Sequence, residues 1–268
     1  MTGAGNIYAH YAYGVRPALF LKSDVLITGG NGTENNPYII EAGDFANYSW
    51  DIIANNVKKG KANLYSIGSE KEVLIDGINY IVRVANNSTP SECCGSDFSQ
   101  TACGFVVEFV DIPETRVMNS TATNVGGWPA SEMHTYANGD FFNKLPSDLQ
   151  NVIIDTKVVS GHGSSDSTNF TSIDKIYLLS GKEIWNAAIT LDTAADFSRQ
   201  LDYYKLKGVT VTTFSGTIKN RNGKATYWWL RTAFPSDNSS FRYVYGTGSG
   251  NSVSATSVYS FAPAFRIG

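Results

Sequence analysis

Residues 227–267 read YWWLRTAFPSDNSSFRYVYGTGSGNSVSATSVYSFAPAFRI, and the fold and function that we expect for the chain depend on this stretch. Two adjacent tryptophans open it, and further aromatic and arginine side chains follow among Ser, Gly, Asn and Thr. Tyr and Trp offer large, stiff contact areas at low entropic cost, while Ser, Gly and Asn offer adaptable hydrogen bonding. The mixture indicates a binding surface. Hairpin loops of an ordinary antiparallel sheet are rich in the same small residues, so a purely structural interpretation stays open.

Alternate side chains of an extended Phe241-Arg-Tyr-Val-Tyr245 run take opposite faces of a sheet. Because the valine is typical of a core, we expect Tyr243 and Tyr245 to be exposed. Trp228 and Trp229 also face apart, and we place Trp229 in the core and Trp228 on the ligand side. The predicted ligand-binding residues are Trp228, Arg231, Ser236, Asp237, Asn238, Ser239, Ser240, Arg242, Tyr243, Tyr245, Asn251, Ser252 and Tyr259.

The composition favours a globular protein that mixes helices and strands. A chain of 268 residues with 42% hydrophobic content is long enough to bury a core. Aromatic residues make up 13% of it and 25 glycines accompany them, which favours strands joined by tight turns. The net charge is −3 and no Lys/Arg run occurs, so we expect no nucleic-acid partner. No apolar segment is long enough to span a bilayer, and residues 1–10 do not have the pattern of an export signal.

Three cysteines, Cys93, Cys94 and Cys103, lie within eleven residues of one another. One of the two adjacent cysteines can pair with Cys103 and close a loop in an oxidising compartment, which leaves an odd thiol. In a reducing cytosol all three stay free. The spacing lacks the further ligands that a zinc site needs, and we expect no metal and no cofactor.

The N-terminal region contains an echo of the C-terminus. Tyr13-Gly-Val-Arg-Pro17-Ala18-Leu-Phe-Leu21 matches Tyr259-Ser-Phe-Ala-Pro263-Ala264-Phe-Arg-Ile267 at its tyrosine, its Pro-Ala pair and its apolar positions. A repeated terminal strand accounts for the match. We therefore predict that residues 1–40 are the terminal strand of a preceding repeat plus a linker, with residues 29–37 as a turn or linker, and that residues 41–268 form the domain.

Between these ends, apolar periodicity predicts the main elements. A short amphipathic helix is expected after Asp44, followed by a hairpin that turns at Asp76-Gly77. A second helical region over residues 130–149 is interrupted by Pro146, and residues 193–207 read as another helix. Two or three helices with twisted antiparallel sheets give an α+β fold class.

Several motifs in this order resemble a bacterial domain family of uncharacterised function, found in surface-anchored and phage-associated proteins. The matching motifs are Ser49-Trp50-Asp51, Gly126-Gly-Trp128-Pro-x-Ser131, Phe141-Phe142-x-x-Leu145-Pro146, Ile173-Asp174-Lys175-Ile176-Tyr177-Leu178-Leu179-Ser180, Trp229-Leu230-Arg231 and the terminal Pro-Ala strand. The family looks like a variant of the C-type lectin fold of the formylglycine-generating-enzyme type, which is similar to variable proteins of diversity-generating retroelements. The resemblance covers residues 45–267 and implies a C-type-lectin-like domain.

The residues favour binding over catalysis. The three histidines, His10, His134 and His162, sit in no nucleophile or metal motif, and the cysteines lie far from the C-terminal strands. We expect a non-enzymatic adhesin or receptor-binding module at a cell surface or on a virion, with a protein or glycan ligand. The small polar residues of 236–259 suggest a retroelement variable region, although turn chemistry enriches the same types. The alternative is a structural repeat of a surface fibre or phage appendage, whose copies contact one another through strands.

Overall fold

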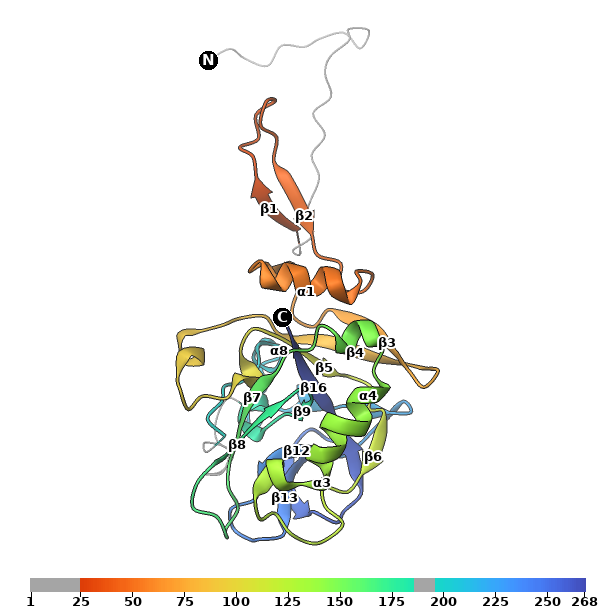
Figure 1. The fold of residues 1–268 in the computed structure, drawn as a ribbon, viewed down its shortest axis with the longest axis vertical. Coiled ribbons are helices and arrows are strands. Elements are labelled where there is room, and N and C mark those ends of the chain that lie inside the picture. Colours follow the sequence, from red (N-terminus) through yellow and green to blue (C-terminus); the bar gives the residue numbers. More distant parts are fainter. Residues whose placement is uncertain (1–24, 186–195) are drawn as a thin grey trace.

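Two five-stranded sheets form the body of the protein in a computed structural model that describes residues 25–185 and 196–268 (Figure 1). The first sheet has the order β3-β4-β5-β16-β9, and its strands are Glu70–Ile75, Ile78–Asn86, Phe105–Phe109, Pro263–Ile267 and Tyr177–Leu178. The second has the order β14-β13-β12-β15-β6, and its strands are Gly250–Ser254, Ser240–Val244, Trp228–Ala233, Tyr259–Phe261 and Glu114–Arg116. All neighbouring strands are antiparallel except β12 and β15.

The last strands of the chain join the two sheets. β15 belongs to the second sheet and β16 to the first, and only Ala262 separates them. β16 lies inside its sheet, where Phe265 pairs with Val107 of β5 and Ala264 pairs with Tyr177 of β9. Its apolar side chains are buried, as expected for a strand with neighbours on both sides. The C-terminal stretch therefore holds both halves of the core together, and the predicted α+β class is confirmed.

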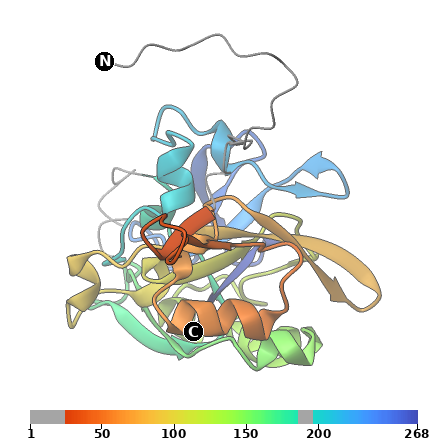
Figure 2. The ribbon, with the colours of Figure 1, turned by 90° about the horizontal axis from the view of Figure 1, so that it is seen from above.

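Helix α1 (Trp50–Lys58) covers the first sheet on the side of the N-terminal hairpin (Figures 1 and 2). The Ser49 hydroxyl accepts from the Ile52 amide, which satisfies one of the free amides of the first turn. Trp50 packs edge-on against Phe45 and Phe265, with ring centroids 5.8 and 6.4 Å away. The helix predicted after Asp44 is confirmed.

The remaining helices are short. The second helical region runs through α2 (Gly127–Ala130), α3 (Glu132–Tyr136), the π-turn η4 (Ala137–Phe141) and α4 (Phe142–Lys144), breaks before Pro146 as predicted, and resumes at α5 (Ser147–Gln150). Single turns complete the set: α6 (Gly181–Ile184), η1 (Ala62–Leu64), η2 (Ser91–Cys94), η3 (Gln100–Ala102) and η5 (Ser215–Thr217). Of the predicted helix over residues 193–207, residues 193–195 lie outside the described part and residues 196–201 are not helical. Only α8 (Asp202–Leu206) forms, because Asp196 and Ser198 make buried hydrogen bonds elsewhere.

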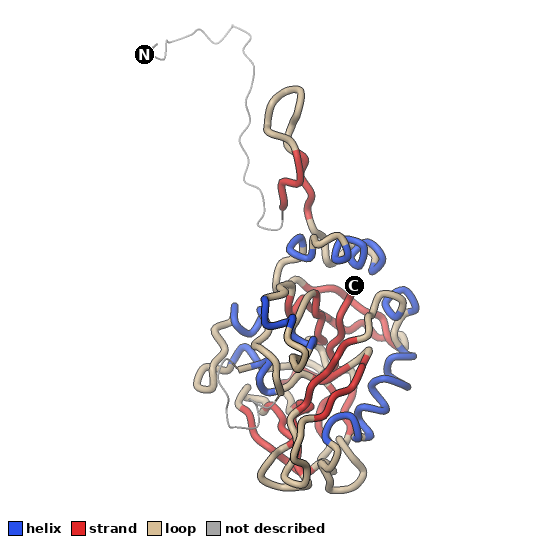
Figure 3. The backbone as a smooth tube through the Cα atoms, turned by 60° about the vertical axis from the view of Figure 1, so that its left-hand side comes forward, coloured by secondary structure: helices blue, strands red, loops and turns tan. Residues whose placement is uncertain are grey.

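Three hairpins lie outside the two sheets: β7–β8 (Thr156–Ser160 and Phe170–Asp174), β10–β11 (Asn220–Arg221 and Lys224–Ala225), and β1–β2 (Val25–Gly29 and Ile39–Ala42). The β1–β2 hairpin projects away from the body (Figures 1 and 3). Its loop contains Gly30, where an added Cβ would lie 1.9 Å from the Pro37 carbonyl oxygen, so that only glycine fits. The predicted terminal strand of residues 13–21 lies outside the described residues, and the repeat boundary at residue 40 stays a prediction.

The cysteines adopt one of the two arrangements left open by the sequence. Cys93 and Cys103 form a disulfide that closes a loop with a sequence separation of 10, and Cys94 is an exposed free thiol. The loop lies against β7: the Lys157 ammonium donates to the Ser96 carbonyl, and the Val159 amide donates to the Ser99 hydroxyl at 3.1 Å. The disulfide loop is thus fixed to the β7–β8 hairpin at several points.

A buried group of charges connects the first sheet to the segment before β10. The Glu108 carboxylate accepts from Arg83 Nε, Lys219 Nζ and the Tyr204 hydroxyl, each at 2.8 Å. Burial alone would raise the pKa of Glu108, but the neighbouring Arg83 and Lys219 outweigh it and lower the pKa to about 2. Attraction therefore exceeds desolvation here, and Glu108 stays ionised inside the core.

Candidate ligand-binding surface

Four tyrosines gather on one face of the second sheet and define what we call the tyrosine surface: Tyr227, Tyr243, Tyr245 and Tyr259. Cross-strand partners share a face of a sheet. Trp229 of β12 pairs with Tyr243 of β13, so the tryptophan belongs to this face. The Tyr243 ring lies 5.0 Å from the Tyr245 ring and 4.7 Å from the Tyr259 ring, measured between centroids. The tyrosine surface is one continuous aromatic cluster.

The cluster is rigid at its base and open at its rim. Trp229 is fully buried beneath Tyr259, and its indole Nε1 donates to the Arg116 carbonyl at 2.9 Å. Tyr243 is only 4% exposed, Tyr245 and Tyr259 are half-buried, and Tyr227 is 44% exposed. The prediction that Tyr243 is exposed was therefore wrong, because the rings of Tyr245 and Tyr259 pack against it. Large side chains that are already held in place lose little conformational entropy when they bind a partner.

Polar atoms at the rim add hydrogen-bonding capacity. Asn251 pairs with Tyr243 across β13 and β14, its side chain is exposed, and its amide donates to the Tyr245 hydroxyl at 3.4 Å. Burial raises the pKa of the Tyr243 phenol, and the hydrogen bond with Tyr245 raises it further. The same bond, together with Asn251, lowers the pKa of Tyr245. The hydroxyls of Tyr243, Tyr245 and Tyr259 are therefore linked to one another.

Trp229 is fully buried as predicted, whereas the prediction that Trp228 lies on the ligand side was wrong. The alternation holds, but it is Trp229 that lies on the tyrosine face, while Trp228 pairs with Val244 on the opposite face. Trp228 is fully buried there, and its Nε1 donates to the Thr217 carbonyl at 3.2 Å. It therefore cannot contact a ligand in this structure.

Both predicted arginines are buried. Arg231 is fully buried and makes two bonds to Glu183, from Nη1 to Oε2 at 2.7 Å and from Nη2 to Oε1 at 2.6 Å. Arg242 is 7% exposed and lies 4.6 Å from the centre of the Phe234 ring. Ser252 pairs with Arg242 and so belongs to the face opposite the tyrosines. The prediction that these arginines contact a ligand is contradicted by their burial.

The predicted loop residues lie at the other end of β13. Ser236 and Asn238 are exposed, Asp237 and Ser239 are half-buried, and Ser240 is 8% exposed. The five residues of β13 separate this loop from Tyr245, which corresponds to roughly 17 Å of extended chain. The structure brings together Tyr243, Tyr245, Asn251 and Tyr259, and it does not bring the loop to them.

Hydrogen bonds from Asn124 and within the loop also hold this loop in place. The Asn124 side-chain amide donates to the carbonyls of Phe234, Asp237 and Ser240 at 2.9 to 3.1 Å. The Asp237 carboxylate accepts from the Ser239 and Ser240 amides at 2.8 and 2.7 Å. The Ser/Asn composition of this loop is therefore explained by turn chemistry, the structural interpretation left open above.

Tyr227 was not among the predicted ligand-binding residues, although it has the largest exposed fraction of the four tyrosines. Its spacing of two from Trp229 was a usable signal, since residues two apart in a strand share a face. Assigning that face required the pairing of β12 with β13, which has a register shift between Trp229 and Ala233.

These features define the class of the protein as an α+β domain with a preorganised aromatic surface. Residues 104–268 match the family described as a domain of unknown function (DUF6273), and the chain belongs to this family. The match begins just before β5 and includes the whole tyrosine surface. No curated protein and no solved structure matches the chain.

No helix in residues 25–185 and 196–268 is long and apolar enough to cross a membrane. Within the same ranges, His, Cys, Asp and Glu side chains form no group of three or more that could hold a metal ion.

Proposed function

We propose that this chain is a non-enzymatic ligand-binding module that contacts its partner through the tyrosine surface. The observation that carries the proposal is the cluster of four tyrosines, anchored through Tyr259 on the buried Trp229, with its rim open to solvent. Aromatic anchors of this kind dominate the energetics of protein interfaces. The partner that suits such a surface is a protein or glycan displayed on a cell.

The motif resemblance supports the finer version of the proposal, a C-type-lectin-like domain of the formylglycine-generating-enzyme type that acts as an adhesin. We place it outside the cell, at a cell surface or on a virion. The Cys93–Cys103 disulfide favours this location, because disulfides persist in oxidising compartments.

Retention of the labelled chain on a glycan array and on intact bacterial cells tests this function. We expect Tyr245→Ser and Tyr259→Ser to weaken binding at least tenfold, because losing an interface anchor costs about 2 kcal/mol. Tyr38→Ser is the matched control, since Tyr38 is 54% exposed on the distant β1–β2 hairpin and should not affect binding. Wild-type binding that survives in both tyrosine variants would refute the proposed surface.

A retroelement variable region is the sharper form of the proposal, and sequencing of the coding segment for residues 225–268 across the source population tests it. We expect substitutions at adenine positions to concentrate at rim residues such as Tyr245 and Asn251. The fully buried Trp229 and Phe241 should stay constant, because replacing them would open cavities in the core. Sparse variation spread evenly over the segment would remove the retroelement interpretation.

A structural repeat is the alternative, and the β1–β2 hairpin favours it. Ile27 and Ile39 are each 57% exposed on a two-stranded hairpin that projects from the body (Figure 3). Isolated hairpins are marginally stable in water, so these side chains suit contact with a neighbouring copy. A repeat of this kind predicts that the wild-type chain binds neither array nor cells, and that deleting residues 25–42 abolishes self-association in light scattering.

A further inference from the structure

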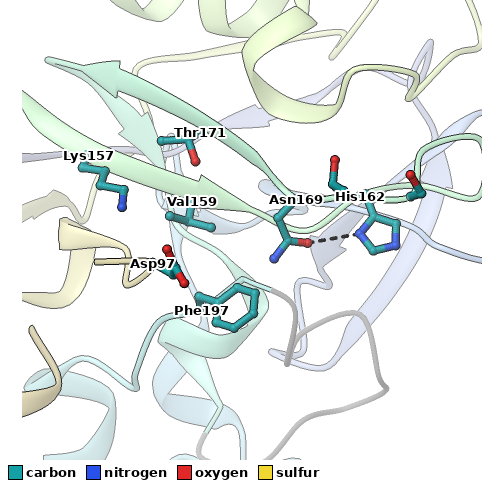
Figure 4. A pocket seen from close by; sticks show the side chains of 9 residues that line it. Asp97, Lys157, Val159, His162, Asn169, Thr171 and Phe197 are labelled. Atoms are coloured by element: carbon teal, nitrogen blue, oxygen red, sulfur yellow. Dashed lines mark hydrogen bonds between the residues drawn. The ribbon is translucent and has the colours of Figure 1, made fainter. Parts of the chain in front are cut away.

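A cavity of about 630 Å³ lies between the β7–β8 hairpin and the disulfide loop (Figure 4). This volume falls within the roughly 300–1,000 Å³ range of small-molecule sites. Val159 and Phe197 are the apolar residues of the lining. The polar lining residues are Asp97, Lys157, His162, Ser167, Thr168, Asn169 and Thr171.

Phe197 is the unusual member of this lining. Its φ is +43°, a left-handed conformation that is strained for a bulky residue. Such a strained conformation persists only where the surrounding structure imposes it. The ring is 49% exposed, so burial of the side chain offsets little of that strain. Figure 4 shows the ring at the cavity, opposite the strands of the hairpin.

Hydrogen bonds of Phe197 and of the residues on either side of it fix this strained backbone conformation. The Phe197 carbonyl accepts from the Ser99 amide at 2.8 Å. On one side, the buried Asp196 carboxylate accepts from the Gly161 amide at 3.0 Å and from the Thr232 hydroxyl at 2.8 Å. On the other side, the Ser198 hydroxyl donates to Glu183 at 2.8 Å. The fold thus holds a large ring at the wall of an open cavity.

The polar lining comes from two sides. Val159 pairs with Thr171 across β7 and β8, and Lys157 lies two residues before Val159, so these three side chains share one face of the hairpin. Beyond the strand end, His162 Nδ1 and Asn169 Oδ1 are 3.1 Å apart. Asp97 faces the hairpin from the disulfide loop (Figure 4).

The chemistry of this lining selects a ligand class. Asp97 and Lys157 carry opposite charges that cancel, so a ligand with a net charge gains from one and is repelled by the other. The hydroxyls of Thr171, Ser167 and Thr168 can each donate and accept, and the Asn169 amide does both. A flat apolar ring beside many donors and acceptors matches a molecule with an apolar C–H face and a rim of hydroxyls.

We propose that the cavity between the β7–β8 hairpin and the disulfide loop is a binding site for a neutral saccharide, with the Phe197 ring as its stacking platform. The site is separate from the tyrosine surface and shares no residue with it.

Saturation-transfer NMR on the full chain tests the site with neutral monosaccharides (glucose, galactose, mannose and N-acetylglucosamine) and with the charged glucuronic and sialic acids as probes. We expect at least one neutral sugar to bind. Phe197→Gly and Asn169→Ala should each weaken its binding at least tenfold, whereas Phe197→Tyr, which keeps the ring, should retain it.

Phe197→Gly also separates a binding role from a structural one. Glycine adopts positive φ without strain, so the variant should unfold at the same temperature as the wild type or a higher one. Asp76→Gly is the matched control, because it relieves a φ of +50° in the distant β3–β4 turn and should leave sugar binding unchanged. Tyr245→Ser should likewise leave it unchanged, which keeps this test independent of the proposed function.

Four results would overturn the proposal. They are the absence of any neutral-sugar signal from the wild type, unaltered binding by Phe197→Gly, a lowered unfolding temperature of that variant, and binding of the charged sugars alone.

Discussion

Glu183→Gln is expected to lower the free energy of unfolding by about 3–5 kcal/mol, because removing one partner of a buried ion pair leaves the other charge uncompensated. Glu183 and Arg231 are both fully buried and are joined by two hydrogen bonds. Glu183 also caps α6, where it accepts from the Ser180 amide at 2.9 Å, and it accepts from the hydroxyls of Ser198 and Thr101. Urea denaturation followed by circular dichroism measures the loss.

Glu132→Gln provides the matched control. Glu132 also follows a serine N-cap and lies in the first turn of its helix, but its side chain is exposed and bonds to Ser120. Exposed carboxylate contacts are screened by solvent and contribute little to stability, so the loss should be much smaller. Equal losses in the two variants would show that the Glu183–Arg231 pair does not hold the core together.

A second variant separates the charge from the packing. Replacing both Glu183 and Arg231 by methionine removes the two charges together, and apolar replacements of buried ion pairs are often neutral or stabilising. We therefore expect the double variant to be more stable than Glu183→Gln. The pair would then contribute more to the choice of one core arrangement than to net stability.

The sequence predicted elements whose signals are local. The spacing of apolar residues after Asp44 was enough for α1, and Asp76-Gly77 was enough for the β3–β4 turn, where both residues have positive φ. Turns and caps depend on residues within a few positions of each other, so their physical causes are visible in the chain.

The site residues depended on partners that lie far away in sequence. From the sequence alone, Arg231 is typical of a binding surface. In the fold it is buried and paired with Glu183, which lies 48 residues earlier in the chain. The composition of the loop after Phe234 is likewise typical of a variable loop. In the fold the loop is hydrogen-bonded by Asn124, which lies more than 100 residues earlier in the chain. Alternation showed that Trp228 and Trp229 face apart, but which face was the core depended on the pairing with β13. The fold class could be predicted, whereas the faces could not.

The C-terminal stretch combines two roles because its strands belong to both sheets. One face of the second sheet is core on the side of Trp228 and Val244, while the other carries the tyrosines. Tyr259 packs on Trp229, so the base of the binding surface is part of the packed interior. Variation at the rim is therefore compatible with stability, and variation at the base is not.

Removing the Cys93–Cys103 disulfide is expected to lower the free energy of unfolding by about 3 kcal/mol, as expected from the chain entropy of a loop of this size. The Cys93→Ala/Cys103→Ala variant tests this in urea, and Cys94→Ala is the matched control because Cys94 is exposed and unbonded. The effect should exceed that of Cys94→Ala because the Cys93–Cys103 bond restricts the unfolded chain, whereas the unbonded Cys94 does not. If the double variant and the control unfold at the same urea concentration, the hydrogen bonds of Ser99 with Val159 and Phe197 are sufficient to order the loop. In that case the disulfide contributes nothing measurable to the stability of the folded state.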